Sequence, residues 1–203
     1  MALPLLIIVT GLPCAGKTLL SRQLADRFNL PYLSKDNIKE RLFDSLGWKD
    51  RAWSKALSRA SIAILFDLME ESLSVNLSIV VDCNFDPKPG EADFRALAER
   101  VAFTPLQIQC VADGPILYQR FLERSGKRHP GHVDEQALEG LAPLLLLGRL
   151  ERMQIGGYYV EVDTSNFMYP IINSDFEDNP PAFTQPIATL EDLFQAIALL
   201  LQS

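Results

Sequence analysis

The chain has 203 residues, of which 48% are hydrophobic, and a net charge of −7. The apolar fraction excludes a disordered chain, the length suits one compact domain over residues 1–203, and the acidic balance disfavours a general nucleic-acid binder, because phosphate contacts need clustered Lys and Arg. No apolar run is long enough to cross a bilayer, and the three dispersed cysteines indicate neither disulfides nor a zinc site, so we expect a cytoplasmic protein without membrane contact.

The first predicted elements are a strand and a helix joined by a glycine-containing loop. Residues 5–9 form an apolar run rich in β-branched side chains, which is typical of a buried parallel strand. Apolar residues then recur at helical spacing from Leu19 to Phe28. Between them, residues 11–18 read Gly-Leu-Pro-Cys-Ala-Gly-Lys-Thr and fit the phosphate-binding pattern G-x-x-x-x-G-K-[ST] at every required position.

This loop predicts a site for the phosphates of Mg-ATP. Strand, loop and helix together wrap backbone N–H groups around phosphate oxygens at a helix N-terminus. Lys17 is expected to reach the β- and γ-phosphates as a catalytic residue, and the Thr18 hydroxyl to ligate Mg²⁺. Cys14 is either a small loop filler or a thiol whose pKa the helix N-terminus lowers. The predicted nucleotide-binding residues are Gly11, Leu12, Pro13, Cys14, Ala15, Gly16, Lys17, Thr18 and Leu19.

The next part of the chain predicts a second strand, two helices and a third strand. A short strand at residues 30–33 leads into a helix capped by Ser34 or Asp36, which ends near Gly47. A long amphipathic helix covers residues 53–73, with Asn76 as a left-handed stop. Further elements are a strand at 78–82, a Pro- and Gly-containing loop at 87–90, and a helix at 92–101.

The C-terminal half continues the alternation of strands and helices. It predicts strands at 106–111 and 158–162 and helices at 116–123, 136–153 and 190–200. Residues 166–186 are rich in Pro, Asn and acidic residues and are expected to form a surface insertion or loop. The predicted fold is therefore a three-layer α/β sandwich, with a five-stranded parallel sheet and helices on both faces.

Two acidic residues are predicted at the carboxyl ends of strands, where ligands bind in such sheets. Asp36 follows the second strand, where an acceptor hydroxyl would meet the γ-phosphate, and its carboxylate is suited to accept or orient the hydroxyl's proton. Lys39 shares its helix face and is a candidate substrate contact. The alternatives are that Asp36 only caps the helix and that Lys39 is a solvated charge.

Asp82 ends the third strand and is a candidate for the Mg²⁺ site together with Thr18, or for acceptor binding. Cys83 follows it, in place of the Glu that would position an attacking water. That difference disfavours a motor-type ATPase and favours transfer to a bound acceptor. The alternative is an acid that merely caps a strand.

The segment 117–133, which we call the lid, is the basic part of an acidic chain. From 117 to 132 there are four basic residues and one acid. Arg120, Arg124 and Arg128 are spaced by four and would line one face if the helix continues, a pattern suited to clamping phosphates. The alternatives are a solvated face or a nucleic-acid phosphate patch. The two histidines, His129 and His132, have no partners at metal-ligand spacing.

Together these motifs resemble the P-loop kinases related to polynucleotide 5′-hydroxyl kinase, zeta toxin and chloramphenicol phosphotransferase. The resemblance covers about residues 5–162 and rests on residues 11–18, 35–39, 81–85 and 120–124. It implies that Asp36 engages the acceptor hydroxyl, that Asp82 is an active-site acid, and that Arg124 is the lid arginine over the phosphates. Lys39 stands where those kinases often carry Arg, and the stretch 128–132, Arg-His-Pro-Gly-His, lies outside the polynucleotide kinase pattern.

The sequence therefore predicts a kinase that transfers the γ-phosphate of Mg-ATP to a hydroxyl of a small molecule. ATP is favoured over GTP because no guanine-reading N-K-x-D motif is present. Two alternatives stay open: a polynucleotide 5′-hydroxyl kinase, and a nucleotide-binding regulatory module without transfer activity. The predicted substrate-contacting residues are Asp36, Lys39, Asp82, Arg120 and Arg128.

Overall fold

The computed structural model describes residues 3–166, 171–173 and 187–202. Its centre is a six-stranded sheet in the order β2-β3-β1-β4-β5-β6. The five predicted strands are present and pair in parallel. Their bounds are β1 Leu5–Gly11, β2 Tyr32–Ser34, β3 Ile79–Asp82, β4 Thr104–Val111 and β5 Tyr158–Asp163. The short β6, Ile171–Asn173, adds an antiparallel edge strand within the predicted insertion at 166–186, which sequence patterning did not indicate.

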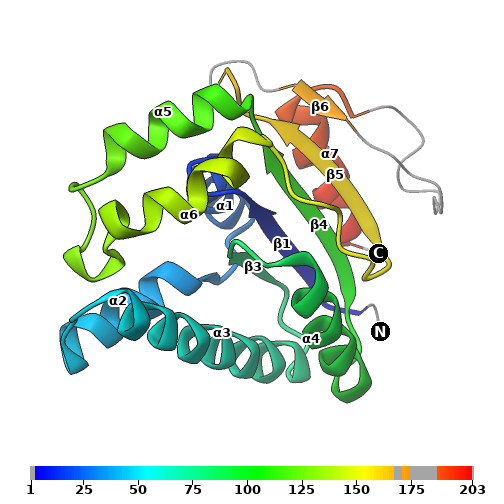
Figure 1. Ribbon diagram of the computed structural model, residues 1–203. Helices are drawn as coiled ribbons and strands as arrows, with labels where there is room; N and C mark the ends of the chain where they lie inside the picture. The colour runs from blue at the N-terminus through cyan, green and yellow to red at the C-terminus, as the bar shows by residue number, and fades with distance from the viewer. Residues whose placement is uncertain (1–2, 167–170, 174–186, 203) are drawn as a thin grey trace.

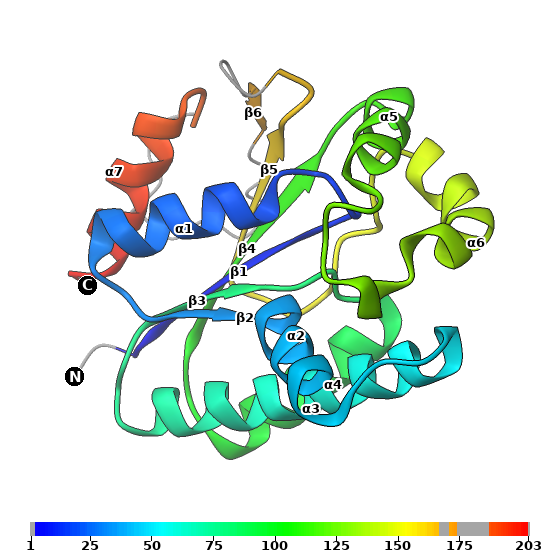
Figure 2. The same ribbon diagram turned by 90° about the vertical axis from the view of Figure 1, so that its left-hand side faces the viewer.

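Seven α-helices of the described residues surround the sheet (Figure 1). They are α1 Lys17–Phe28, α2 Lys35–Leu46, α3 Arg51–Ser74, α4 Pro87–Arg100, α5 Gly114–Arg124, α6 Asp134–Leu146 and α7 Leu190–Leu200. Figures 1 and 2 show α1 and α7 on one face of the sheet, α3 and α4 on the other, and α5 and α6 beyond the carboxyl ends of the central strands. No helix in this part of the chain combines the length and apolar character that a membrane span requires.

Strand β1 explains the three layers. All seven of its residues are buried, because alternate side chains enter different cores. Leu5, Ile7 and Val9 pack with α1, α5, α6 and α7, whereas Leu6 and Ile8 pack with α3 and α4. Because β1 is buried on both faces and lies between β3 and β4, the loop that follows it is held at the carboxyl end of the strands, near the middle of the sheet.

The capping and turn residues in the sequence predicted most helix ends correctly. Ser34, not Asp36, caps α2: its hydroxyl accepts a hydrogen bond from the Asn37 N–H at 3.4 Å. Asp36 is thereby left free of a capping role. Gly47 has a φ of 77° and ends α2, and Asn76 has a φ of 60° just beyond α3.

Two predicted boundaries were wrong. The expected loop at 87–90 is instead the first turn of α4, which tolerates proline because an N–H at that position would have no helical partner. The predicted helix at 136–153 ends at Leu146, since Gly148 takes a φ of 78° and turns the chain back toward β4. There its carbonyl accepts a hydrogen bond from the Ala112 N–H at 3.2 Å.

Candidate active site

The loop after β1 has the backbone geometry that a phosphate cradle requires. Gly11 has a φ of 138°, and a Cβ there would lie 2.2 Å from the carbonyl oxygen of Cys110. Gly16 has a φ of 81° and immediately precedes α1. Both positions therefore need glycine, one for close approach to β4 and one for the left-handed turn. The predicted nucleotide-binding residues thus surround the N-terminus of α1, where N–H groups converge.

Lys17 and Cys14 face the same cavity from this loop. The Lys17 Nζ donates a hydrogen bond to the Leu12 carbonyl at 2.8 Å, which holds the ammonium over the loop. Burial raises the pKa of the Cys14 thiol more than the charges of Arg124 and Lys17 lower it. Cys14 therefore fills the loop as a neutral thiol and does not have the lowered pKa considered from the sequence.

Thr18 and Asp82 meet at the base of the cavity. The Thr18 hydroxyl donates to Oδ2 of Asp82 at 2.6 Å, and the Tyr32 hydroxyl donates to the same oxygen at 3.0 Å. Asp82 is only 4% exposed, and the β1–β3 register places it opposite Val9, two residues before the loop. A hydroxyl beside a buried carboxylate fits Mg²⁺, which takes few protein oxygens and completes its shell with phosphates and water. No cluster of three His, Cys, Asp or Glu side chains able to hold a metal occurs within the described ranges.

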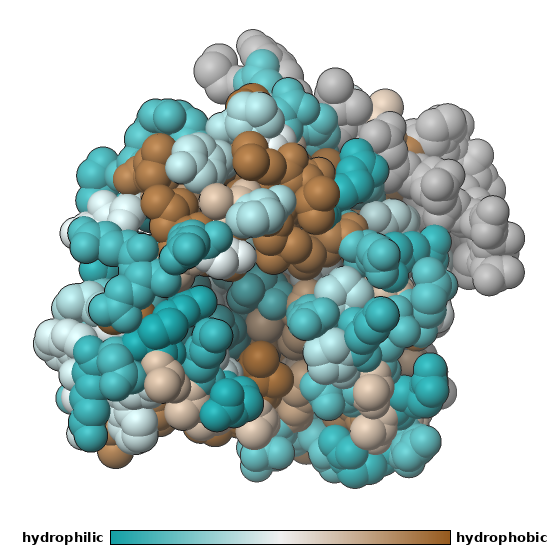
Figure 3. All heavy atoms as spheres, in the orientation of Figure 1, coloured by the Kyte–Doolittle hydropathy of each residue, from teal (hydrophilic) through white to brown (hydrophobic). Residues whose placement is uncertain are grey.

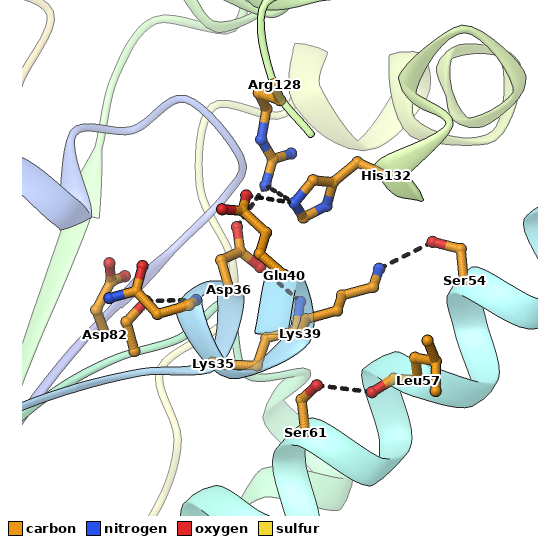
Figure 4. A network of polar contacts seen from close by, with 12 residues as sticks. Lys35, Asp36, Lys39, Glu40, Ser54, Leu57, Ser61, Asp82, Arg128 and His132 are labelled. Carbon is orange, nitrogen blue, oxygen red and sulfur yellow. Dashed lines mark hydrogen bonds and ion pairs between the residues drawn. The ribbon is translucent and has the colours of Figure 1, made fainter. Parts of the chain in front are cut away.

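Asp36 lies across the cavity, in the first turn of α2, between two cations (Figure 4). Its Oδ1 is 3.0 Å from the Lys35 Nζ, and its Oδ2 is 2.6 Å from the Arg128 Nη2. Burial alone would raise the pKa of Asp36, but the charges of Lys35 and Arg128 outweigh it and hold the pKa well below its usual range. Asp36 is therefore ionised at any physiological pH.

Lys39 is deeply buried, not a solvated charge. It is 4% exposed, its Nζ donates to the Ser54 hydroxyl of α3 at 2.9 Å, and the ammonium lies 5.2 Å from the centre of the Phe43 ring. Burial, reinforced by the charge of Lys35, lowers its pKa to about 8. Figure 4 shows Lys39 and Asp36 on neighbouring turns of α2.

The three lid arginines reach the cavity by different routes. Helix α5 ends at Arg124, because Ser125 leaves the helical conformation and Gly126 has a φ of 76°, so the helix does not continue to Arg128 and the condition for one helical arginine face is not met. Arg120 donates to the carbonyls of Thr164 and Ser165 beyond β5, at 2.8 and 3.1 Å. The Arg124 Nε is buried and has no hydrogen-bond partner among the described residues.

Arg128 reaches the cavity because the stretch 128–132 docks on α2. Gly131 lies against the Phe43 ring, where a Cβ would be 2.6 Å from ring carbons, and the His129 ring stacks on Phe43 at 5.1 Å. The His132 Nε2 lies 2.8 Å from Glu40 and 3.0 Å from Arg128. Burial and the charge of Arg128 lower the pKa of His132 to about 3, so it is neutral.

The sequence analysis assigned no role to several residues that line the cavity. Lys35 and Asp134 flank the predicted groups, and Arg51 and Ser58 come from α3. The one sequence signal for this part of the cavity was the unusual stretch 128–132, whose Arg128 forms an ion pair with Asp36.

The predicted catalytic, metal-binding and substrate-contacting residues converge on a cavity of about 370 Å³, hollowed into the face seen in Figure 3, whereas Gly11, Leu12 and Ala15 of the predicted nucleotide-binding set do not line it. Three carboxylates line it: Asp36, Asp82 and Asp134. Seven cationic side chains also line it: Lys17, Lys35, Lys39, Arg51, Arg120, Arg124 and Arg128. The cavity is thus strongly positive in a chain of net charge −7, and it suits anionic ligands.

Comparison with known proteins identifies the family and the fold. Residues 6–142 match the family model described as an AAA domain. A crystal structure of "a putative kinase" from Chloroflexus aurantiacus is 40% identical with a TM-score of 0.77, over 81% of this chain and 90% of that one. A structure from the PezAT toxin–antitoxin system of Streptococcus pneumoniae, 14% identical, has a TM-score of 0.56 over 100% of this chain and 89% of that one, which is a likeness of fold alone. Curated proteins yielded no match.

Proposed function

Because this chain belongs to the AAA-domain family and has the fold of P-loop kinases, we propose that it transfers the γ-phosphoryl group of Mg-ATP to a hydroxyl of a small molecule. One observation carries the proposal. A single cavity holds the phosphate loop, the Thr18–Asp82 pair and the ionised Asp36. A nucleotide and a hydroxyl compound bound there would lie side by side, which is the arrangement that phosphoryl transfer requires.

The nucleotide end of the cavity would bind and polarise the phosphates. The N–H groups around Gly16 and the Lys17 ammonium would bind the β- and γ-phosphates, while Thr18 and Asp82 would hold Mg²⁺. The bound Mg²⁺ would neutralise charge on the phosphate oxygens. Arg124, whose Nε has no hydrogen-bond partner among the described residues, would donate to the transferring group, where negative charge redistributes.

The acceptor end would hold the hydroxyl on Asp36. In the reaction the hydroxyl oxygen forms a bond to the γ-phosphorus, the bond from that phosphorus to the β,γ-bridging oxygen breaks, and ADP leaves. The hydroxyl proton passes to the Asp36 carboxylate and then to water. Lys35 and Arg128 make this carboxylate a weak base, so its main role would be to orient the hydroxyl. Orientation is enough because a loose transition state requires little deprotonation of the attacking hydroxyl.

A screen of γ-phosphate transfer tests the proposal. Labelled ATP and Mg²⁺ would be incubated with the protein and a panel of hydroxyl metabolites, neutral and charged, and with 5′-hydroxyl oligonucleotides. Transfer to a small molecule that is lost in Lys17→Ala supports the proposal. Labelling of oligonucleotides alone would establish the polynucleotide kinase alternative, and tight ATP binding without any transfer would establish a regulatory module.

A further inference from the structure

The acceptor end of the cavity carries more positive charge than its own carboxylates neutralise. Four cations lie there, Lys35, Lys39, Arg51 and Arg128, with two carboxylates, Asp36 and Asp134. Lys35 and Arg128 pair with Asp36, and Arg128 also lies 3.4 Å from Asp134. Both carboxylates are thereby matched within the protein.

Lys39 and Arg51 have no counter-ion within 4.0 Å among the described residues. The ion pairs of the described residues include neither side chain. The only hydrogen-bond partner of the Lys39 ammonium in this part of the chain is the neutral Ser54 hydroxyl, although the residue is 4% exposed. A buried charge without a compensating charge is costly, and proteins tolerate one chiefly where a ligand supplies the partner.

The charged groups around Lys39 add to this imbalance of charge. The charges of Lys35, Arg51 and Arg128 all disfavour its protonated form, and burial does so most of all; Asp36 alone acts in the opposite direction. Several cations therefore repel one another around one volume of the cavity. Ser58, one turn from Ser54 on α3, adds a hydroxyl to the same wall. An anion placed here would relieve the repulsion and find hydrogen-bond donors from both helices.

We propose that the acceptor carries an anionic group, a carboxylate or a phosphate, in addition to its hydroxyl, and that Lys39 and Arg51 bind this group with Ser58 as a further donor. This inference rests on the proposed kinase function. Asp36 and Lys39 are three residues apart on α2, where side chains start roughly 5–6 Å from each other, so a single small molecule can reach both. We therefore infer an acceptor of the size of a small hydroxy acid or sugar phosphate.

A binding experiment tests the site without requiring catalysis. The phosphate loop is first filled with Mg²⁺ and the non-hydrolysable analogue adenylyl imidodiphosphate. Inorganic phosphate, D-glycerate or glycerol is then titrated into the protein in a calorimeter. We expect phosphate and D-glycerate to bind and glycerol not to bind. Lys39→Met and Arg51→Gln should each weaken anion binding by about tenfold or more, the usual loss for a charge-assisted hydrogen bond.

Matched controls separate this site from a general attraction of anions. Arg59→Gln removes an exposed cation from the same helix as Arg51 and should leave binding unchanged. Lys39→Arg keeps the charge and should retain binding, and thermal melting of each variant checks its folding. Equal affinity for D-glycerate and glycerol, or unchanged phosphate binding in the Lys39→Met/Arg51→Gln double variant, would overturn the inference.

Transfer assays distinguish failure of this inference from failure of the kinase function. Phosphorylation of glycerol as fast as of D-glycerate and glycerol 3-phosphate would refute the anionic acceptor while supporting a kinase. A functional anion site without transfer to any compound would refute the kinase instead. Transfer to 5′-hydroxyl oligonucleotides but to no small anion would overturn the small acceptor.

Discussion

Replacing Asp36 with Asn tests the acceptor end of the cavity most directly. The substitution keeps the shape of the side chain but removes the charge that lies 3.0 Å from Lys35 and 2.6 Å from Arg128. It also removes the carboxylate that would orient the hydroxyl and receive its proton. Loss of such a group slows reactions by about 10²–10⁴-fold, which corresponds to roughly 2.7–5.5 kcal/mol in the barrier.

The effect on stability should be far smaller. The Asp36 side chain is 44% exposed, whereas those of Lys35 and Arg128 are 9% and 18% exposed, so solvent screens the two ion pairs only in part and their loss should lower the free energy of unfolding by about 1 kcal/mol. Since the pKa of this carboxyl is lowered in the folded protein, that contribution is present at neutral pH and is lost only as pH falls below the ordinary range of an aspartate. ATP affinity should also persist, because the hydrogen bonds and ion pairs of Asp36 among the described residues go to Lys35 and Arg128 and not to the phosphate loop.

The assay measures single-turnover transfer of labelled γ-phosphate at saturating ATP, beside ATP affinity and thermal melting. Asp67→Asn is the control, because Asp67 is an exposed carboxylate on α3 outside the cavity. A transfer rate within about threefold of wild type in Asp36→Asn, with unchanged folding, would refute the assigned role and leave Asp36 as a structural ion-pair partner.

Three further variants test other parts of the site. Arg124→Ala should slow transfer by about 10³–10⁵-fold and weaken ATP binding much less, as measured by single-turnover kinetics; a change below about threefold would make Arg124 a surface charge. The pKa of Lys39 is about 8, so the side chain loses its charge as pH rises through 8, and the affinity for an anionic acceptor should fall over the same range. Lys39→Arg should remove this pH dependence. A pH-independent KM in the wild type would contradict the prediction. Gly131→Ala places a Cβ 2.6 Å from the Phe43 ring and should cost about 1–3 kcal/mol in the free energy of unfolding, measured by denaturant titration; full stability would show that the docked segment yields easily.

The sequence alone determined the nucleotide end of the site. Residues 5–18 contain a strand pattern, two glycines and the Lys-Thr pair in consecutive order, so their relative positions follow from local backbone rules. The five parallel strands followed in the same way from alternating apolar runs and turn signals. Asp82 was recognisable because it directly ends one of those strands.

The acceptor end depended on the tertiary structure, because its residues come from segments far apart in the chain. Arg128 meets Asp36 only since Gly131 fits against Phe43, and no periodicity in the sequence encodes that contact. The sequence left Lys39 open as a substrate contact or a solvated charge, and the packing of α3, which supplies the Ser54 hydroxyl, is what buries it. Arg51 joined the cavity solely through the packing of α3 beside α2. Local sequence pattern therefore specified the elements and the phosphate loop, whereas long-range packing decided which charges line one cavity, and the anionic acceptor that we propose rests on that packing.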